Sequence, residues 1–218
     1  LSDVPPAAPT GLDLLAGSDL GSSSSDNVTS ANSATVRVAF EVLATDGSAA
    51  IAGNTVRVLA GGVAVGGETL RAADITNGYI DVVANIAGIA DGPVALAATI
   101  TDSAGLESPL SAALSVLRDT APPAVVVTLD QSALQVGVAA TVTFTFSEVP
   151  VGFGAANITY DTASATLGAL SATSNPLVYT ASLTPTTGAD DAINVITVGT
   201  GWTDVAGNSP SASSSSAN

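Results

Sequence analysis

Residues 35–42 read Thr-Val-Arg-Val-Ala-Phe-Glu-Val, and this stretch decides the fold class. Apolar side chains occupy every second position, at Val36, Val38, Phe40 and Val42, and charged side chains stand between them at 37 and 41. Because successive side chains of a β-strand point to opposite faces of the sheet, this alternation predicts a strand with one buried face and one exposed face.

Short runs of the same kind recur along the chain, separated by turn residues. We expect strands at 11–15, 34–42, 54–60, 79–85, 93–101 and 111–117 in the first half, and at 125–129, 141–146, 177–183 and 191–198 in the second half. No window shows sustained helical spacing. Roughly seven short strands per ~100 residues are typical of an immunoglobulin-like (Ig-like) β-sandwich, so the sequence predicts an all-β fold.

Two short patterns occur twice, in the same order. Residues 1–7, Leu-Ser-Asp-Val-Pro-Pro-Ala, align with residues 118–124, Arg-Asp-Thr-Ala-Pro-Pro-Ala. Thr-Asp-Ser-Ala-Gly at 101–105 matches Thr-Asp-Val-Ala-Gly at 203–207. Self-similarity at a fixed period indicates repeated structural units. We therefore predict two tandem Ig-like β-sandwich domains, residues 1–118 and residues 119–218.

The charge balance limits the possible partners. The chain has 19 acidic residues, four arginines and no lysine, and its formal net charge is −15. Nucleic acid is excluded because phosphate binding needs clustered cations, and an anionic membrane surface would repel the chain. No stretch approaches the ~20 consecutive apolar residues of a membrane helix, so we expect no membrane insertion. Carboxylates that converge in such a chain favour a bound divalent cation.

Cysteine, methionine and histidine are all absent. This absence removes disulfides, thiolate nucleophiles, imidazole bases and the usual zinc ligands, so most enzyme mechanisms lose their central group. A pair of carboxylates for glycoside hydrolysis is the enzymatic alternative that the sequence leaves open, although nothing places an acid in an apolar pocket. We expect no catalytic activity. The acidic, lysine-free composition favours an exported protein.

Five motifs carry a resemblance to a known family. The first domain has Asp-Leu-Gly at 19–21 and Asp-Asn-Val-Thr at 26–29, and the second has Phe-Ser-Glu at 146–148, Asn-Ile-Thr at 157–159 and Thr-Asp-Val-Ala-Gly-Asn at 203–208. In this order they resemble the bacterial Ig-like repeat domains of giant surface adhesins, of the biofilm-associated and RTX types. The resemblance implies a stalk or spacer role in a secreted adhesin at the bacterial cell surface, often with calcium at domain junctions. It implies no catalysis.

The resemblance also implies partners. These are neighbouring Ig-like repeats of the same chain, and surface glycans or proteins reached through other domains. The first domain departs from the family pattern at Leu106, where the family often has Asn.

The topology of an Ig sandwich supplies a separate argument for a cation. The start of the first strand, the loop after the second strand and the loop before the last strand all lie at one pole. Asp119, Glu148 and Asp204 occupy these three places in the second domain. Oxygen ligands from several loops, without Lys or Arg nearby, are what calcium requires. The sequence therefore predicts a calcium site at these three residues.

Other residues with side-chain oxygens are weaker candidates for ligands. Four lie at the pole of the first domain that would face this site in a tandem array: Asp19, Asp26, Asn27 and Asp91. Asp3 and Asp102 mark the opposite pole of the first domain, and Asp130 fits a ligand or a turn residue equally well. Asp, Asn and Gly favour turns for local reasons. We interpret five further aspartates as solvated turn residues: Asp46, Asp74, Asp161, Asp190 and Asp191.

Three classes of function are compatible with these observations. The first is a structural extender, whose stacked repeats project a distal head. The second is a carbohydrate- or protein-binding module with recognition loops, and the third is a surface-layer or filament subunit that assembles through edge strands. Trp202 could stack on a sugar, but a lone Trp beside a loop is more often part of the core. Aromatic residues are few and scattered, which favours the extender.

Overall fold

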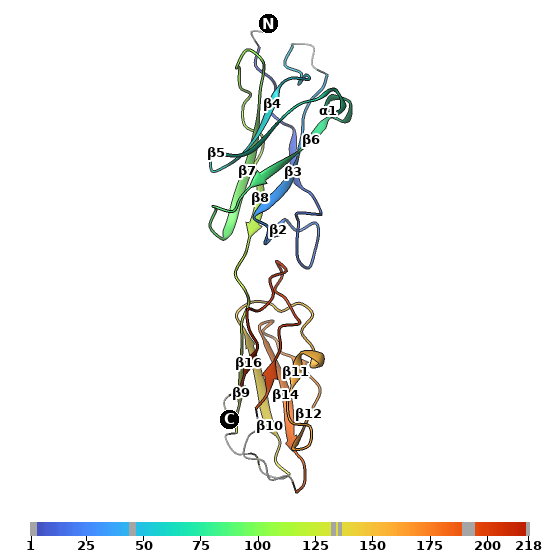
Figure 1. Cartoon of the computed structure of the whole chain (residues 1–218), viewed down its shortest axis with the longest axis vertical. Coiled ribbons are helices and arrows are strands. Elements are labelled where there is room, and N and C mark those ends of the chain that lie inside the picture. Colours follow the sequence, from blue (N-terminus) through green and yellow to red (C-terminus); the bar gives the residue numbers. More distant parts are fainter. Residues whose placement is uncertain (1–3, 44–46, 132–133, 135–136, 189–194, 217–218) are drawn as a thin grey trace. The chain divides into compact units, whose positions relative to one another are not determined.

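The computed structural model describes residues 4–43, 47–131, 134, 137–188 and 195–216 (Figure 1). The chain divides into two compact units, Leu1–Thr120 and Ala121–Asn218. The boundary expected from the sequence, after residue 118, lies two residues earlier. Among the described residues, no helix is long and apolar enough to cross a membrane.

The first unit is built of two sheets. One sheet has three strands in the order β1-β3-β6, and the other has five in the order β2-β8-β7-β4-β5. The strands of the first sheet are β1 (Gly11–Leu14), β3 (Ser33–Ala39) and β6 (Tyr79–Asn85). Those of the second are β2 (Val28–Thr29), β4 (Thr55–Ala60), β5 (Val63–Thr69), β7 (Gly92–Thr101) and β8 (Leu114–Arg118). Short β2 pairs in parallel with β8, and the other pairs are antiparallel.

The alternation in β3 buries one face of the strand, as the sequence predicted. Val36 and Val38 are completely buried and Phe40 is 5% exposed, all within one aliphatic core. Arg37 points to the other face, where it pairs with Asp81 of β6. The strand ends at Ala39, earlier than expected, although the Phe40 N–H still donates to the Gly78 carbonyl at 3.0 Å in the same register. The sequence pattern thus predicted the face that is buried, and erred only at the end of the strand.

Three elements of the first unit were not predicted: β2, β5 and helix α1. Helix α1 (Ala72–Asn77) is a short addition to a fold that is all-β as predicted. It has six residues and no buried residue, so it is too short to produce a helical period in the sequence. Strand β5 was also missed, because its side chains are mostly exposed and its Gly66-Gly67 pair interrupts any alternation.

The second unit has a different strand order. One sheet runs β12-β14-β10-β9, with β13 also paired to β14, and the other runs β11-β15-β16. The larger sheet contains β9 (Val125–Leu129), β10 (Ala140–Phe146), β12 (Ala165–Leu167), β13 (Ser171–Ala172) and β14 (Val178–Pro185). The smaller contains β11 (Ile158–Thr159), which follows the 3-10 helix η1 (Ala155–Asn157), then β15 (Thr197–Val198) and β16 (Ser214–Ser215). This is the division of a constant-type Ig domain. The strand expected at 191–198 is seen at Thr197–Val198, and residues 191–194 lie outside the described residues.

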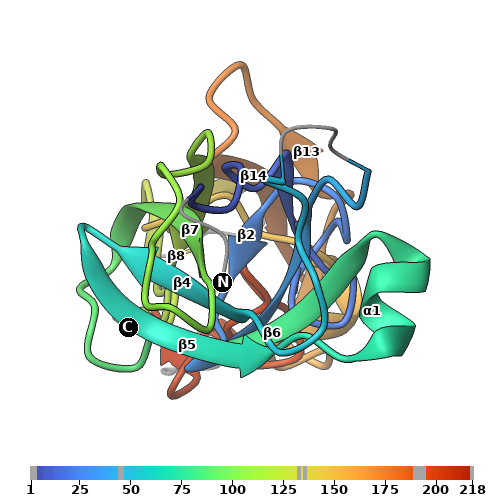
Figure 2. The same cartoon turned by 90° about the horizontal axis from the view of Figure 1, so that it is seen from above.

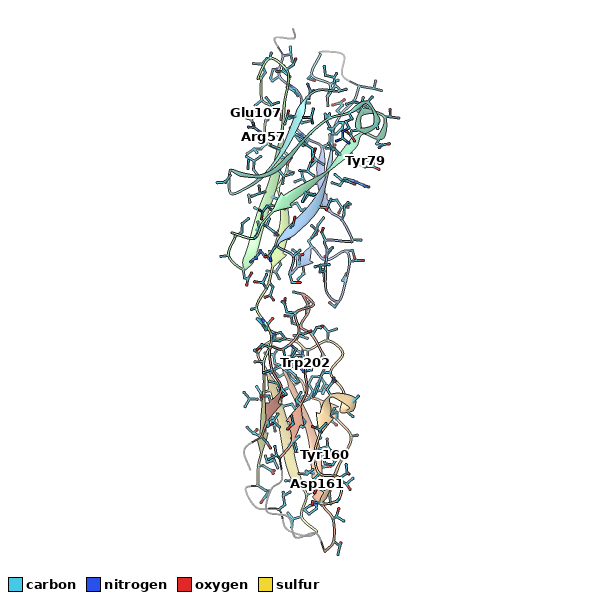
Figure 3. All side chains as sticks on the ribbon, viewed as in Figure 1. Arg57, Tyr79, Glu107, Tyr160, Asp161 and Trp202 are labelled. Carbon is cyan, nitrogen blue, oxygen red and sulfur yellow. The ribbon has the colours of Figure 1, made fainter. Side chains whose placement is uncertain are left out.

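An aromatic cluster fills one end of the second core. The Phe146 ring lies edge-on to Trp202, with centroids 4.9 Å apart, and 4.7 Å from Phe153. Trp202 is 2% exposed, and its indole N–H donates to the Gly199 carbonyl at 2.9 Å. The interpretation of Trp202 as a core residue is confirmed, and a sugar-stacking role for it is excluded by its burial (Figure 3).

The close approach of β5 to β6 gives a test of the packing in the first unit. A methyl group on Gly66 would lie 2.3 Å from the Val83 carbonyl oxygen, which is backbone and cannot turn away. We expect Gly66→Ala to destabilise the first unit by about 1–3 kcal/mol, the usual cost of overpacking. Urea unfolding measures this loss. Gly88→Ala is the matched control because a methyl group there meets nothing within 4 Å; equal stability of the two variants would contradict the close approach.

Candidate functional site

Three segments that carry predicted ligands are joined by backbone hydrogen bonds. Asp119 stands before β9, Glu148 follows β10, and Asp204 lies between β15 and β16. The Ser147 N–H donates to the Ala124 carbonyl at 2.9 Å, which ties the approach to β9 to the loop after β10. Val151 and Thr203 exchange two backbone hydrogen bonds, of 2.7 and 3.0 Å, which tie that loop to the segment of Asp204.

These bonds bring three carboxylates close together. One oxygen atom from each of Asp119, Glu148 and Asp204 lies within 4.8 Å of the other two. Two oxygens that bind the same calcium ion at 2.3–2.6 Å are at most about 5 Å apart. The spacing therefore allows one ion to contact all three residues, and the donor set consists of the hard oxygens that calcium prefers. This is the convergence that the sandwich topology predicted.

Asp204 is the most buried of the three, at 1% exposed. One of its carboxylate oxygens accepts the Asn208 backbone N–H and the other accepts the Asn208 side-chain amide, both at 2.9 Å. Its own N–H donates to the Asn208 carbonyl at 3.0 Å. Gly207 takes a φ of 87°, in the left-handed region, which closes the loop and explains the glycine of the repeated pattern.

Asp102 forms the same loop in the first unit. Its N–H donates to the Leu106 carbonyl at 3.0 Å, one carboxylate oxygen accepts the Leu106 N–H at 2.8 Å, and Gly105 has a φ of 84°. The repeated pattern thus specifies one loop conformation in both units. Leu106, however, has no side-chain donor where Asn208 supplies one.

The first unit does not gather carboxylates at this loop. Among the described residues, Asp102 belongs to no group of three acidic side chains, and Asp3 lies outside them. A hollow of about 160 Å³ occurs there instead, lined by residues that include Val4, Ile51 and Asp102, and its walls are mostly apolar. The equivalent cation pole of the first unit stays a prediction, because Asp3, one of its two expected ligands, lies outside the described residues.

The acidic loop before β2 has a structural role. Asp19 is 3% exposed, and its two oxygens accept the backbone N–H groups of Asn27 and Val28 at 3.1 and 3.2 Å. Asp26 also accepts the Val28 N–H, and Asn27 has a φ of 59°. These contacts give the two carboxylates a structural role in their own loop, and cation binding by Asp19, Asp26 and Asn27 stays a prediction.

Asp91 pairs with a buried arginine. Arg118 is 5% exposed; its Nη1 donates to Asp91 and its Nη2 to the Asn32 side-chain oxygen at 3.0 Å. The Thr120 hydroxyl donates to the same Asp91 carboxylate at 2.9 Å, and the Asp119 N–H donates to the Thr29 carbonyl at 2.9 Å. This carboxylate therefore neutralises a buried cation of the chain itself, and calcium binding by Asp91 stays a prediction.

The remaining aspartates fix turns. Asp130 accepts the Thr141 N–H at 2.8 Å and so positions the start of β10, which agrees with its interpretation as a turn residue, and its role as a ligand stays a prediction. Asp161 accepts from Ala163 and Ser164, and Asp74 accepts the Arg71 N–H at 2.7 Å, so the turn interpretation of both is confirmed. Asp46, Asp190 and Asp191 lie outside the described residues.

Comparison with known proteins identifies one family. Residues 119–218 match the family model described as a bacterial Ig-like domain. The matched range begins at Asp119 and includes all three grouped carboxylates. No curated protein matches the chain.

The Arg118 network gives a second test of stability. Asp91→Ala removes the charged acceptor of a buried guanidinium, and we expect it to destabilise the first unit by about 1–3 kcal/mol in urea unfolding. Asp13→Ala is the matched control, because Asp13 is an exposed carboxylate on β1. If both variants unfolded at the same urea concentration, Arg118 would not depend on Asp91.

Proposed function

We propose that this chain is a segment of the stalk of an exported bacterial adhesin, in which Ig-like domains follow one another, and that calcium bound by Asp119, Glu148 and Asp204 stiffens the connection. The observation that carries the proposal is the convergence of these carboxylates from three separate segments within 4.8 Å. Neighbouring repeats of the same chain are then its main partners, and its place is the cell surface.

The electrostatics of the group support a cation. Three carboxylates at this spacing repel one another when all are ionised. Asp204 is almost completely buried, and its hydrogen bonds to Asn208 come from neutral amides. A buried charge is costly unless an opposite charge compensates it. A divalent cation supplies the opposite charge for the Asp204 carboxylate. The amides of Asn208 supply hydrogen bonds but no charge.

The architecture supports a spacer role. The sequence repeats its loop pattern in two sandwiches, one of which matches the bacterial Ig-like family, and domains of this family are commonly extracellular. The only Trp is buried, which removes the most effective aromatic anchor from the surface. The chain has no Cys, His or Lys to serve as nucleophile or base, which favours a role without catalysis.

The alternative of lateral assembly through edge strands has less support. Strand β5 ends the larger sheet of the first unit, but Gly66 of that strand meets the backbone of Val83 in β6. An edge that is covered by a neighbouring strand is a poor template for pairing with another chain.

Terbium luminescence tests the metal site directly. Tb³⁺ is a hard cation that occupies calcium sites, and Trp202, the only Trp, lies two residues before Asp204. We expect excitation of Trp202 to sensitise Tb³⁺ emission that calcium displaces. Asp204→Asn and Glu148→Gln should abolish this emission, and Asp130→Asn should retain it. Emission that survives both site variants would place the ion elsewhere.

Thermal unfolding tests what the ion contributes. A ligand that binds only the folded state stabilises it by about 2.7 kcal/mol when its free concentration is about 100 times Kd. We expect calcium to raise the Tm of the second unit, EDTA to lower it, and Asp204→Asn to remove the difference. Identical melting curves in calcium and in EDTA would refute the site.

The stiffening is tested separately. Because the chain has no Cys, two spin labels are readily introduced through Thr76→Cys and Thr128→Cys, both at exposed positions. Calcium should narrow the distribution of distances between the labels. If Tb³⁺ bound but calcium did not narrow the distribution of distances, the metal site would stand and the proposed stiffening would be refuted.

A further inference from the structure

The first unit carries a polar hollow that the stalk role does not use. It has a volume of about 380 Å³ and lies where β5, α1 and β6 meet (Figures 1 and 2). Side chains able to hydrogen-bond dominate its walls: Glu68, Arg71, Asp74, Asn77, Tyr79 and Asp81. Its volume falls in the range of about 300–1,000 Å³ that is usual for ligand sites.

Helix α1 forms one wall of the hollow, and its Ile75 packs, partly buried, against the core of the first unit. The helix is well defined at both ends. Asp74 accepts the Arg71 N–H at 2.7 Å, and the Gly78 N–H donates to the Asp74 carbonyl at 2.8 Å, with Gly78 at a φ of 75°. The capped helix therefore presents Arg71, Asp74 and Asn77 to the hollow in a defined arrangement.

The opposite wall is held rigid by Arg37. Its Nε and Nη2 donate to the two oxygens of Asp81 at 2.8 and 2.9 Å, and its guanidinium carbon lies 3.8 Å from the centre of the Tyr79 ring. The pKa of Arg37 is raised above its ordinary value because Asp81 accepts its hydrogen bonds. Arg37 therefore orients the Asp81 carboxylate and covers one face of the Tyr79 ring, so a ligand would stack on the opposite face. Figure 3 labels Tyr79 on its strand.

The hydrogen-bonding groups that line the hollow favour one class of ligand. Carboxylates only accept hydrogen bonds, a guanidinium only donates, and the Asn77 amide does both. A sugar matches this mixture, since each hydroxyl both donates and accepts, and its apolar C–H face suits an aromatic ring such as Tyr79. Three carboxylates stand against one arginine in the walls, and the whole chain carries −15, so acidic sugars and phosphates are repelled.

We propose that this hollow binds a neutral saccharide, so that the first unit is a glycan-contacting domain as well as a spacer. Asp81 and Tyr79 provide the fixed acceptor and the stacking surface, and Arg71 and Asn77 of the α1 segment provide donors. A single shallow site of this kind binds weakly. Repetition along a chain or on a surface raises the overall strength through multivalency.

Chemical-shift mapping of the ¹⁵N-labelled full chain tests this proposal. The probes are the methyl glycosides of glucose, galactose and mannose, and N-acetylglucosamine. We expect at least one to shift the amides of residues 66–81 saturably, with Kd on the order of 1 mM. Tyr79→Ala and Asp81→Asn should each weaken it by about tenfold or more, equivalent to a lost stacking or hydrogen-bonding contact. Asp13→Asn, on β1 of the same sheet, should bind as the parent does.

Three outcomes would overturn the proposal. No shift from any probe at about 20 mM, some twenty times the expected Kd, would leave the hollow without saccharide affinity. Shifts outside residues 66–81 would place binding elsewhere. Stronger binding of a tetralysine peptide at the same amides, with no sugar response, would identify a site for cationic ligands. Because Tyr79 contacts Arg37, its variant is accepted only if amides remote from β6 keep their positions; Asp81→Asn provides the independent test.

Discussion

The backbone hydrogen bond to an aspartate carboxylate is the interaction on which most of this structure depends. The chain has many more acidic than basic side chains, so few carboxylates can be neutralised by a cation of the chain itself. Asp19, Asp102, Asp130 and Asp204 instead accept backbone N–H groups in loops. Charge-assisted bonds of this kind are stronger than neutral ones. They shape the turns of a protein with no disulfides, and they leave Asp204 buried beside two further carboxylates.

The two units resemble each other more in the conformation of one loop than in the arrangement of their sheets. The same aspartate-to-glycine loop stands before the last strand of each, with the same left-handed glycine. The second unit divides its strands as a constant-type Ig domain does, whereas the first extends its larger sheet with β5 and adds α1. The polar hollow is lined by these added segments, whereas the carboxylate group is not. The polar hollow lies in the first unit, and the carboxylate group follows the loops of the second.

The features that the sequence predicted follow from the two-residue period of β-strands and from the strand order of an Ig-like sandwich. Alternation located β3, β6 and β7 to within a few residues, because each has a continuous buried face. The convergence of Asp119, Glu148 and Asp204 followed because the order of strands in a sandwich decides which loops share a pole. Asp91 and Arg118 could not be paired in advance, since they are 27 residues apart and meet only through the register that places Gly92 opposite Arg118. Helix α1 and β5 bury too little to leave a pattern in the sequence.

The bonds of Asp119 and Thr120 have a consequence for how such chains evolve. Both residues are anchored in the first unit, through Thr29 and Asp91, yet the family match to the following domain already starts at Asp119. A duplication or recombination event that cut the gene at this point would divide a segment that two domains need. When repeats are gained or lost, residues 119–120 should therefore stay joined to both neighbouring domains. We expect recombination points in tolerant loops inside the domains more often than at the apparent domain boundary.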